Sequence, residues 1–221
     1  MVEVALALGL SGLAMACLFD RHLVRACCLF LVFAVSMAMA WWRLQAPFLG
    51  LAELGLGAVL TGLSLFHALG FLPASSPRPP YRDVLREPSH HAAARALLAL
   101  AWLVMVGIAV AQSFVVTLDP LSAQPLLIAG VTLVAAGLGA FALHRHLLRR
   151  LLAFNVLGSG VFLLTIGVAG ITAQSQALVT VGLVVAWLGT LLGAMLTRRL
   201  FHLQGRRALS NGGRPNGEPP P

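Results

Sequence analysis

The chain has 221 residues, of which 59% are apolar and only 10% are charged. Because about 25% of the residues in an ordinary soluble domain are charged, a water-soluble fold is excluded and an all-α, polytopic membrane protein is expected. The net charge of +8 is then assigned to arginines that flank membrane spans, so no nucleic-acid partner is expected. The chain contains no lysine, which excludes a retinal Schiff base and hence a rhodopsin.

Seven apolar stretches approach the length of about 20 residues that a helix needs to cross the hydrocarbon core. We therefore predict seven transmembrane helices, at Val4–Phe19, Ala26–Trp42, Phe48–Leu72, Ala96–Leu118, Pro125–Leu143, Leu151–Ile171 and Ala177–Leu196.

The arginines predict the orientation of these spans. With the N-terminus outside, every arginine except Arg43 falls on the inner side, in agreement with the positive-inside rule. Adding or removing one span would scatter the arginines over both faces. The sequence thus predicts a multi-pass membrane protein with its N-terminus outside and its C-terminus in the cytoplasm.

Composition divides the chain into four parts. Residues 1–72 form a predicted three-helix membrane bundle, and residues 73–95 are rich in proline and predict an irregular cytoplasmic linker. Residues 96–204 form a predicted four-helix membrane bundle. The segment 205–221 is rich in Gly, Pro and Asn and is expected to be disordered.

Glu53 is the acidic residue that lies deep inside an apolar stretch. A charged carboxylate at the centre of a membrane helix costs about 2.5–3.5 kcal/mol on insertion scales, so such a residue is a functional-site hypothesis by default. No basic residue of this chain is expected at the same depth. We therefore expect any counter-charge of Glu53 to come from another subunit.

Further polar side chains share the predicted helical face of Glu53. With 3.6 residues per turn, Thr61, Ser64 and His67 follow Glu53 toward the inner side and could hold a chain of water molecules. Glu53 and His67 are about 21 Å apart at 1.5 Å per residue, so they cannot touch. The four residues are predicted to form a proton or ion relay, with a packing role for Glu53 as the alternative.

Glycines on the third predicted span suggest a second, close-packing face. Gly55 and Gly62 are seven residues apart, so a regular α-helix would place them together, opposite Glu53. Small residues allow the backbones of membrane helices to approach closely. We predict that this face packs against a neighbouring helix.

A second polar cluster interrupts the sixth predicted span. Asn155 and Ser159 are four residues apart and share a helical face. Polar groups at such positions more often form hydrogen bonds between helices than line a path. The sequence shows no catalytic constellation, no metal-ligand spacing and no cofactor motif, so we expect a subunit that is not an enzyme and holds no metal or cofactor.

The third span resembles a helix of the small membrane subunits of multisubunit Na+/H+ (Mrp-type) antiporters and of the D-type membrane component of membrane-bound hydrogenases. The resemblance rests on Ala46-Pro47, on Glu53 and on the step Gly57-Ala58. Phe48 stands where the family usually has Asp, and Ala52 stands where the hydrogenase branch has Thr.

The last two spans resemble a different component, the antiporter C subunit, which is similar to the K subunit of respiratory complex I. The stretch from Arg149 to Val161 resembles its basic turn and the Leu-rich helix that follows, and Gln176-Ala-Leu-Val179 resembles the entry to its last helix. The resemblance implies a fusion of two small subunits joined by the linker.

The leading hypothesis is a small subunit of a multisubunit proton- or cation-translocating complex that relays H+, or Na+, through Glu53. Its partners would be other membrane subunits of an antiporter-like or respiratory complex, and the lipid bilayer. One alternative is a structural scaffold that seals and assembles larger antiporter-like subunits without titrating. The other is a stand-alone membrane transporter.

Overall fold

The computed structural model describes residues 2–20, 22–70, 125–144 and 146–204, together with five isolated positions between 97 and 108. Every regular element in the four ranges is a helix, as the composition predicts. Six of the described helical segments are long and apolar enough to cross a membrane.

These six segments match six of the seven predicted spans. They are α1 (Val2–Phe19), α2 (Leu23–Arg43), the third span (Pro47–Ala68), α6 (Pro125–Leu143), α7 (Leu147–Ala169) and α8 (Ala173–Gln204). The predicted span Ala96–Leu118 lies almost entirely outside the described residues, and the linker at 73–95 and the tail at 205–221 lie wholly outside them. The count of seven therefore stays a prediction.

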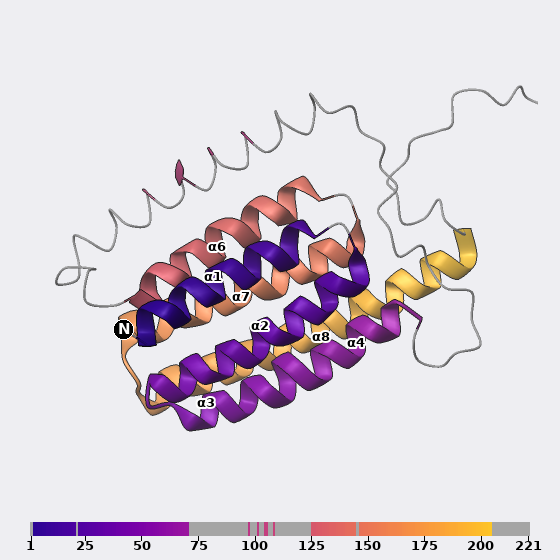
Figure 1. Ribbon diagram of the computed structural model, residues 1–221. Coiled ribbons are helices and arrows are strands. Elements are labelled where there is room, and N and C mark those ends of the chain that lie inside the picture. Colours follow the sequence, from indigo (N-terminus) through magenta and orange to yellow (C-terminus); the bar gives the residue numbers. More distant parts are fainter. Residues whose placement is uncertain are drawn as a thin grey trace, which may run out of the picture.

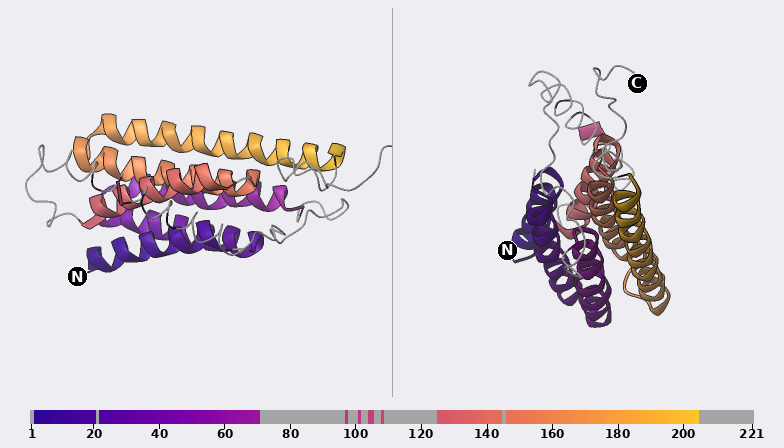
Figure 2. Two further views of the ribbon diagram at one scale, coloured as in Figure 1. Left: turned by 90° about the horizontal axis from the view of Figure 1, so that it is seen from above. Right: turned by 90° about the vertical axis from the view of Figure 1, so that its right-hand side faces the viewer.

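The helices lie side by side along one long axis (Figures 1 and 2). They form a ring in which α1 packs against α6, α6 against α7, α7 against α8, α8 against the third span, and the third span against α2. α2 closes the ring against α1 and also reaches α7. Helices of the two predicted bundles thus contact one another, and each of the six spans contributes buried apolar side chains to one common cluster.

The helix ends gather at two opposite ends of the ring. At one end, Glu3, Leu44, Pro125 and Gly170 line the same cavity. At the other end, the last turn of the third span meets α8, and the first turn of α7 contacts the last turn of α1. This second end holds four of the arginines that are predicted to lie on the inner side, namely Arg25, Arg149, Arg150 and Arg198. The direction of the chain across the membrane stays a prediction.

The last turn of α1 is contacted by His144, which follows α6, and by the cationic side chain of Arg149 on α7. The carbonyl oxygen of Leu18 lies 2.9 Å from Nε2 of His144 and accepts a hydrogen bond of 3.3 Å from Nη1 of Arg149. A cation at the C-terminal end of a helix interacts favourably with the helix dipole. This contact therefore stabilises the arginine-rich end of the ring.

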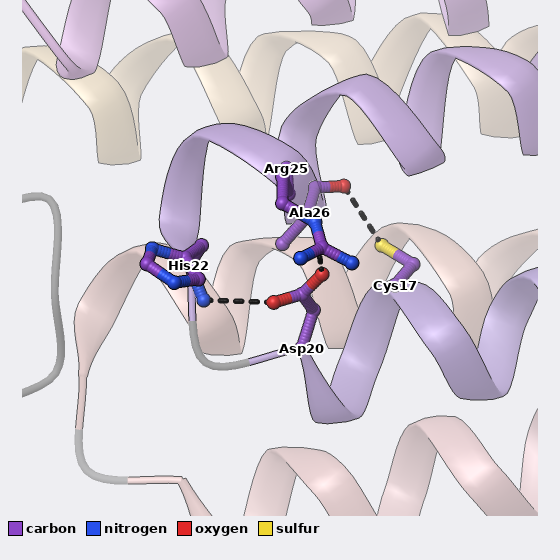
Figure 3. Close-up of polar contacts among 5 residues, drawn as sticks. All are labelled: Cys17, Asp20, His22, Arg25 and Ala26. Atoms are coloured by element: carbon purple, nitrogen blue, oxygen red, sulfur yellow. Dashed lines mark hydrogen bonds and ion pairs between the residues drawn. The ribbon is translucent and has the colours of Figure 1, made fainter.

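The turn between α1 and α2 is organised by Asp20 (Figure 3). Its Oδ2 lies 3.0 Å from Nε of Arg25, and its Oδ1 accepts a hydrogen bond of 2.9 Å from the backbone N–H of His22. The thiol of Cys17 donates a hydrogen bond to the carbonyl oxygen of Ala26 at 3.3 Å. These contacts hold the last turn of α1 beside the first turn of α2.

The third span departs from the expected regular α-helix. It consists of α3 (Pro47–Ala52), the π-helix η1 (Glu53–Leu60) and α4 (Thr61–Ala68). In a π-helix the backbone hydrogen bonds join residues five apart instead of four. Here both the N–H and the hydroxyl of Thr61 donate to the carbonyl oxygen of Leu56.

The contact between α6 and α7 depends on glycines that admit the opposite backbone. A Cβ at Gly160 would lie 2.8 Å from the carbonyl oxygen of Gly130 and 2.8 Å from the backbone nitrogen of Val134. A Cβ at Gly158, two residues earlier, would meet only the ring of Phe162 at 3.9 Å. The two glycines of this Gly-Ser-Gly sequence therefore differ sharply in the space around them.

We predict that Gly160→Ala destabilises the protein, because the added methyl group forces α6 and α7 apart. Overpacking of this kind costs about 1–3 kcal/mol. Gly158→Ala is the matched control, since it makes the same chemical change in the same helix without a backbone clash. Thermal unfolding of the detergent-purified protein should give a lower Tm for Gly160→Ala only, and equal Tm values would contradict the packing described here.

Candidate functional site

Glu53 opens the π-helix and is sealed inside the protein, with only 2% of its surface exposed. The indole Nε1 of Trp41, on α2, donates a hydrogen bond of 3.4 Å to Oε2 of Glu53. This distance is longer than the usual 2.7–3.2 Å for an N–H donor. Within the described residues Glu53 takes part in no ion pair.

Two glycines give Glu53 this position. Gly50, on the turn before Glu53, lies so close to α2 that a Cβ there would be 3.1 Å from the carbonyl oxygen of Ala38. Gly57 lies one turn after Glu53, and a Cβ there would overlap Oε1 of Glu53 and lie 3.0 Å from its Cδ. The carboxyl group therefore lies between the indole of Trp41 and the backbone of Gly57.

The hydroxyl groups predicted to continue the relay are buried but bonded to their own helix. Thr61 donates to the carbonyl oxygen of Leu56 at 2.7 Å, and Ser64 donates to that of Leu60 at 2.8 Å. A hydroxyl oxygen still has acceptor lone pairs when its hydrogen is used in this way. Both oxygens can thus accept a hydrogen bond from water, although neither forms a hydrogen bond with Glu53.

His67 ends the polar stripe beside an arginine of α8. Nη1 of Arg198 lies 3.1 Å from Nε2 and 3.2 Å from Nδ1 of His67. Because a guanidinium group only donates, the imidazole acts as the acceptor in this contact. The stripe therefore leads from a buried carboxyl group in the π-helix to a positively charged group at the arginine-rich end.

Residues 7–74 match the MbhD family model, which describes the D component of the membrane-bound hydrogenase MBH. The matched residues cover most of α1, all of α2 and all of the third span, and they include Trp41, Glu53 and His67. We call residues 7–74 the MbhD-like segment. No curated protein and no solved structure matches the chain. The match supports the resemblance to membrane components of membrane-bound hydrogenases and Mrp-type antiporters for this segment, whereas the resemblance of the last two spans to the antiporter C subunit stays a prediction.

The close-packing face expected in the MbhD-like segment is divided in the structure. Gly62 is buried, and a Cβ there would meet the side chain of Leu31 on α2. Gly55 is exposed, with no atom within 4 Å of the position of a Cβ. The π-helix explains the difference, since its wider turns rotate Gly55 away from the face that Gly62 occupies.

Asn155 lies outside the MbhD-like segment and joins α7 to α8. Its Nδ2 donates a hydrogen bond of 2.7 Å to the hydroxyl oxygen of Thr190, and both residues are buried. Ser159, one turn further along α7, is also buried. The contact is the interhelical hydrogen bond that the sequence favours, but the sequence does not indicate its acceptor because Thr190 lies 35 residues away.

We predict that Thr190→Val destabilises the α7–α8 contact, because Asn155 loses its acceptor on α8. Interhelical hydrogen bonds in membranes contribute about 0.6 kcal/mol on average and up to about 1.7 kcal/mol. Thr197→Val is the matched control, since Thr197 is a buried threonine of the same helix whose hydroxyl donates to the backbone of α8.

A double-mutant cycle of Thr190→Val with Asn155→Leu, followed by reversible unfolding in mixed micelles, measures the coupling energy. A value near zero would show that this hydrogen bond adds nothing to the contact.

Proposed function

We propose that the chain is a small integral membrane subunit of a multisubunit proton- or cation-translocating complex related to membrane-bound hydrogenases. In this proposal Glu53 exchanges a proton, or Na+, and Thr61, Ser64 and His67 continue the relay. The buried carboxyl group without an ionic partner among the described residues carries the proposal, because such a group is expensive in a membrane and marks a site of ion or proton movement. The family match of residues 7–74 supports the class of complex.

The π-helix adds a second reason to place the site here. Single π turns inside α-helices are rare and occur frequently at functional sites. In this chain the π-helix begins at Glu53 and ends just before Thr61, so it lies between the first two members of the proposed relay.

The proposed path needs water between its members. Glu53, Thr61 and Ser64 form no hydrogen bonds with one another. A proton can therefore move between them only along water molecules that donate hydrogen bonds to their oxygens. The relay ends at His67, whose ring lies beside the guanidinium group of Arg198 on α8.

The chain would work without catalytic chemistry of its own and within a larger membrane assembly. Only 28% of the apolar stretch of α1, and only 22% of that of α8, is buried inside the protein. Large apolar side chains such as Leu8 and Leu192 point outward, which suits contact with lipid and with partner subunits in a prokaryotic inner membrane. The same surface would serve a scaffold subunit, which is the second candidate function.

We predict that Glu53→Gln lowers proton-driven ion transport by the assembled complex about tenfold or more, which corresponds to roughly 1.4 kcal/mol in the barrier. The amide keeps the size of the side chain and cannot exchange a proton near neutral pH. Transport is measured as ΔpH-driven flux in inverted membrane vesicles.

Glu3→Gln is the matched control, because Glu3 is an exposed carboxyl residue at the start of α1. Unchanged transport in Glu53→Gln with normal assembly would favour the scaffold function instead.

We predict that Thr61→Val also lowers transport while assembly stays normal, because valine keeps the shape and removes the hydroxyl oxygen from the path. Thr165→Val is the matched control, since the hydroxyl of Thr165 also donates to a carbonyl oxygen of its own helix, that of Val161 at 2.8 Å, and Thr165 is only half-buried. Equal fluxes in the two variants would remove Thr61 from the relay.

A further inference from the structure

The carboxyl group of Glu53 has two oxygens in unlike surroundings. Oε2 faces the indole N–H of Trp41, whereas Oε1 lies over Gly57, where any other residue would place its Cβ. The indole nitrogen donates a hydrogen bond and cannot accept one. It can therefore bond to Glu53 in both charge states, but it can neither deliver nor remove the proton at Oε2.

We infer that Trp41 is a positioning residue for Glu53, and that the carboxyl group exchanges its proton at Oε1, in the space over Gly57. This inference rests on the proposed function, because it assigns the exchange to one oxygen of the same residue. Holding Oε2 against α2 stops the carboxyl group from rotating and turns Oε1 toward the backbone of the π-helix.

The packing of the two helices fixes this arrangement. Trp41 has no exposed surface, so its ring cannot turn away without opening the core. The missing side chain of Gly50 lets α3 approach α2 at Ala38 and Trp41. Glu53 follows within one turn and comes within reach of the indole, and the glycine at position 57 then leaves room for the second oxygen.

The neighbouring residues provide matched controls for both halves of the inference. Trp42 is adjacent to Trp41 on α2, but 48% of its surface is exposed. Gly55 lies in the same π-helix as Gly57, but the space around it is open. Each pair of substitutions therefore makes one chemical change at two positions, of which only one contacts Glu53.

The experiment is infrared difference spectroscopy of the complex purified from native membranes, recorded between acidic and alkaline pH. The C=O stretching band of protonated Glu53 is identified by its loss in Glu53→Gln. Trp41→Phe should shift this band to higher frequency, because a carboxyl group that loses a hydrogen bond to its carbonyl oxygen vibrates faster. Trp42→Phe should leave the band in place.

Gly57→Ala tests the other oxygen and remains decisive if Trp41→Phe does not assemble. Its methyl group overlaps only the flexible side chain of Glu53, so the fold should survive while the band shifts and transport falls. Gly55→Ala should change neither. A band at the wild-type position in both Trp41→Phe and Gly57→Ala would overturn the inference. Normal transport in Glu53→Gln would instead reject the relay, while the band shifts would still decide whether Trp41 positions the carboxyl group.

Discussion

A carboxyl group that is removed from water has to be compensated inside the protein, and here that requirement is met by the packing of the third span against α2. The compensation is modest, since it consists of a single indole N–H at 3.4 Å and no ion pair among the described residues. It depends on glycines at positions 50 and 57, one of which lets the helices approach and the other of which makes room for the carboxyl group. Packing alone would be served better by an apolar side chain, which needs no hydrogen-bond partner when it is buried.

The ring arrangement brings helices from both halves of the chain into contact with the third span. The third span contacts α2 on one side and α8 on the other, and the contact between His67 and Arg198 joins the far end of the polar stripe to the second half. The second half of the chain, which contains α6, α7 and α8, therefore packs against the first half, because α8 covers the side of the third span that α2 leaves open.

Hydropathy and charge predicted the helical class and the location of the described spans, because the length of apolar sequence that crosses a membrane is fixed by the bilayer. Burial of Glu53 also followed from its position in an apolar stretch. The partners could not be predicted in the same way. An opposite charge is the expected partner of a buried carboxylate, so the sequence does not point to the indole of Trp41. Thr190 and Arg198 are brought to their partners only by the packing of α8.

The sequence also does not predict that Gly55 points away from the helical face that holds Gly62, and the reason is a different one. Projection of the sequence onto a regular helix assumes 3.6 residues per turn throughout, and no hydrophobic pattern reveals where hydrogen bonds change to the π spacing. Two glycines in Gly55-Leu-Gly57 weaken the α-helical preference at this point, which is the one local signal that the sequence contains.

The π-helix also affects how this span should be compared with related ones. A π turn holds an additional residue, so it acts on the rest of a helix as a one-residue insertion would. The residues before Glu53 and the residues after Leu60 therefore need alignment offsets that differ by one residue. An alignment without a gap against a span that is α-helical throughout would match one half of the polar stripe and misplace the other by about a quarter of a turn.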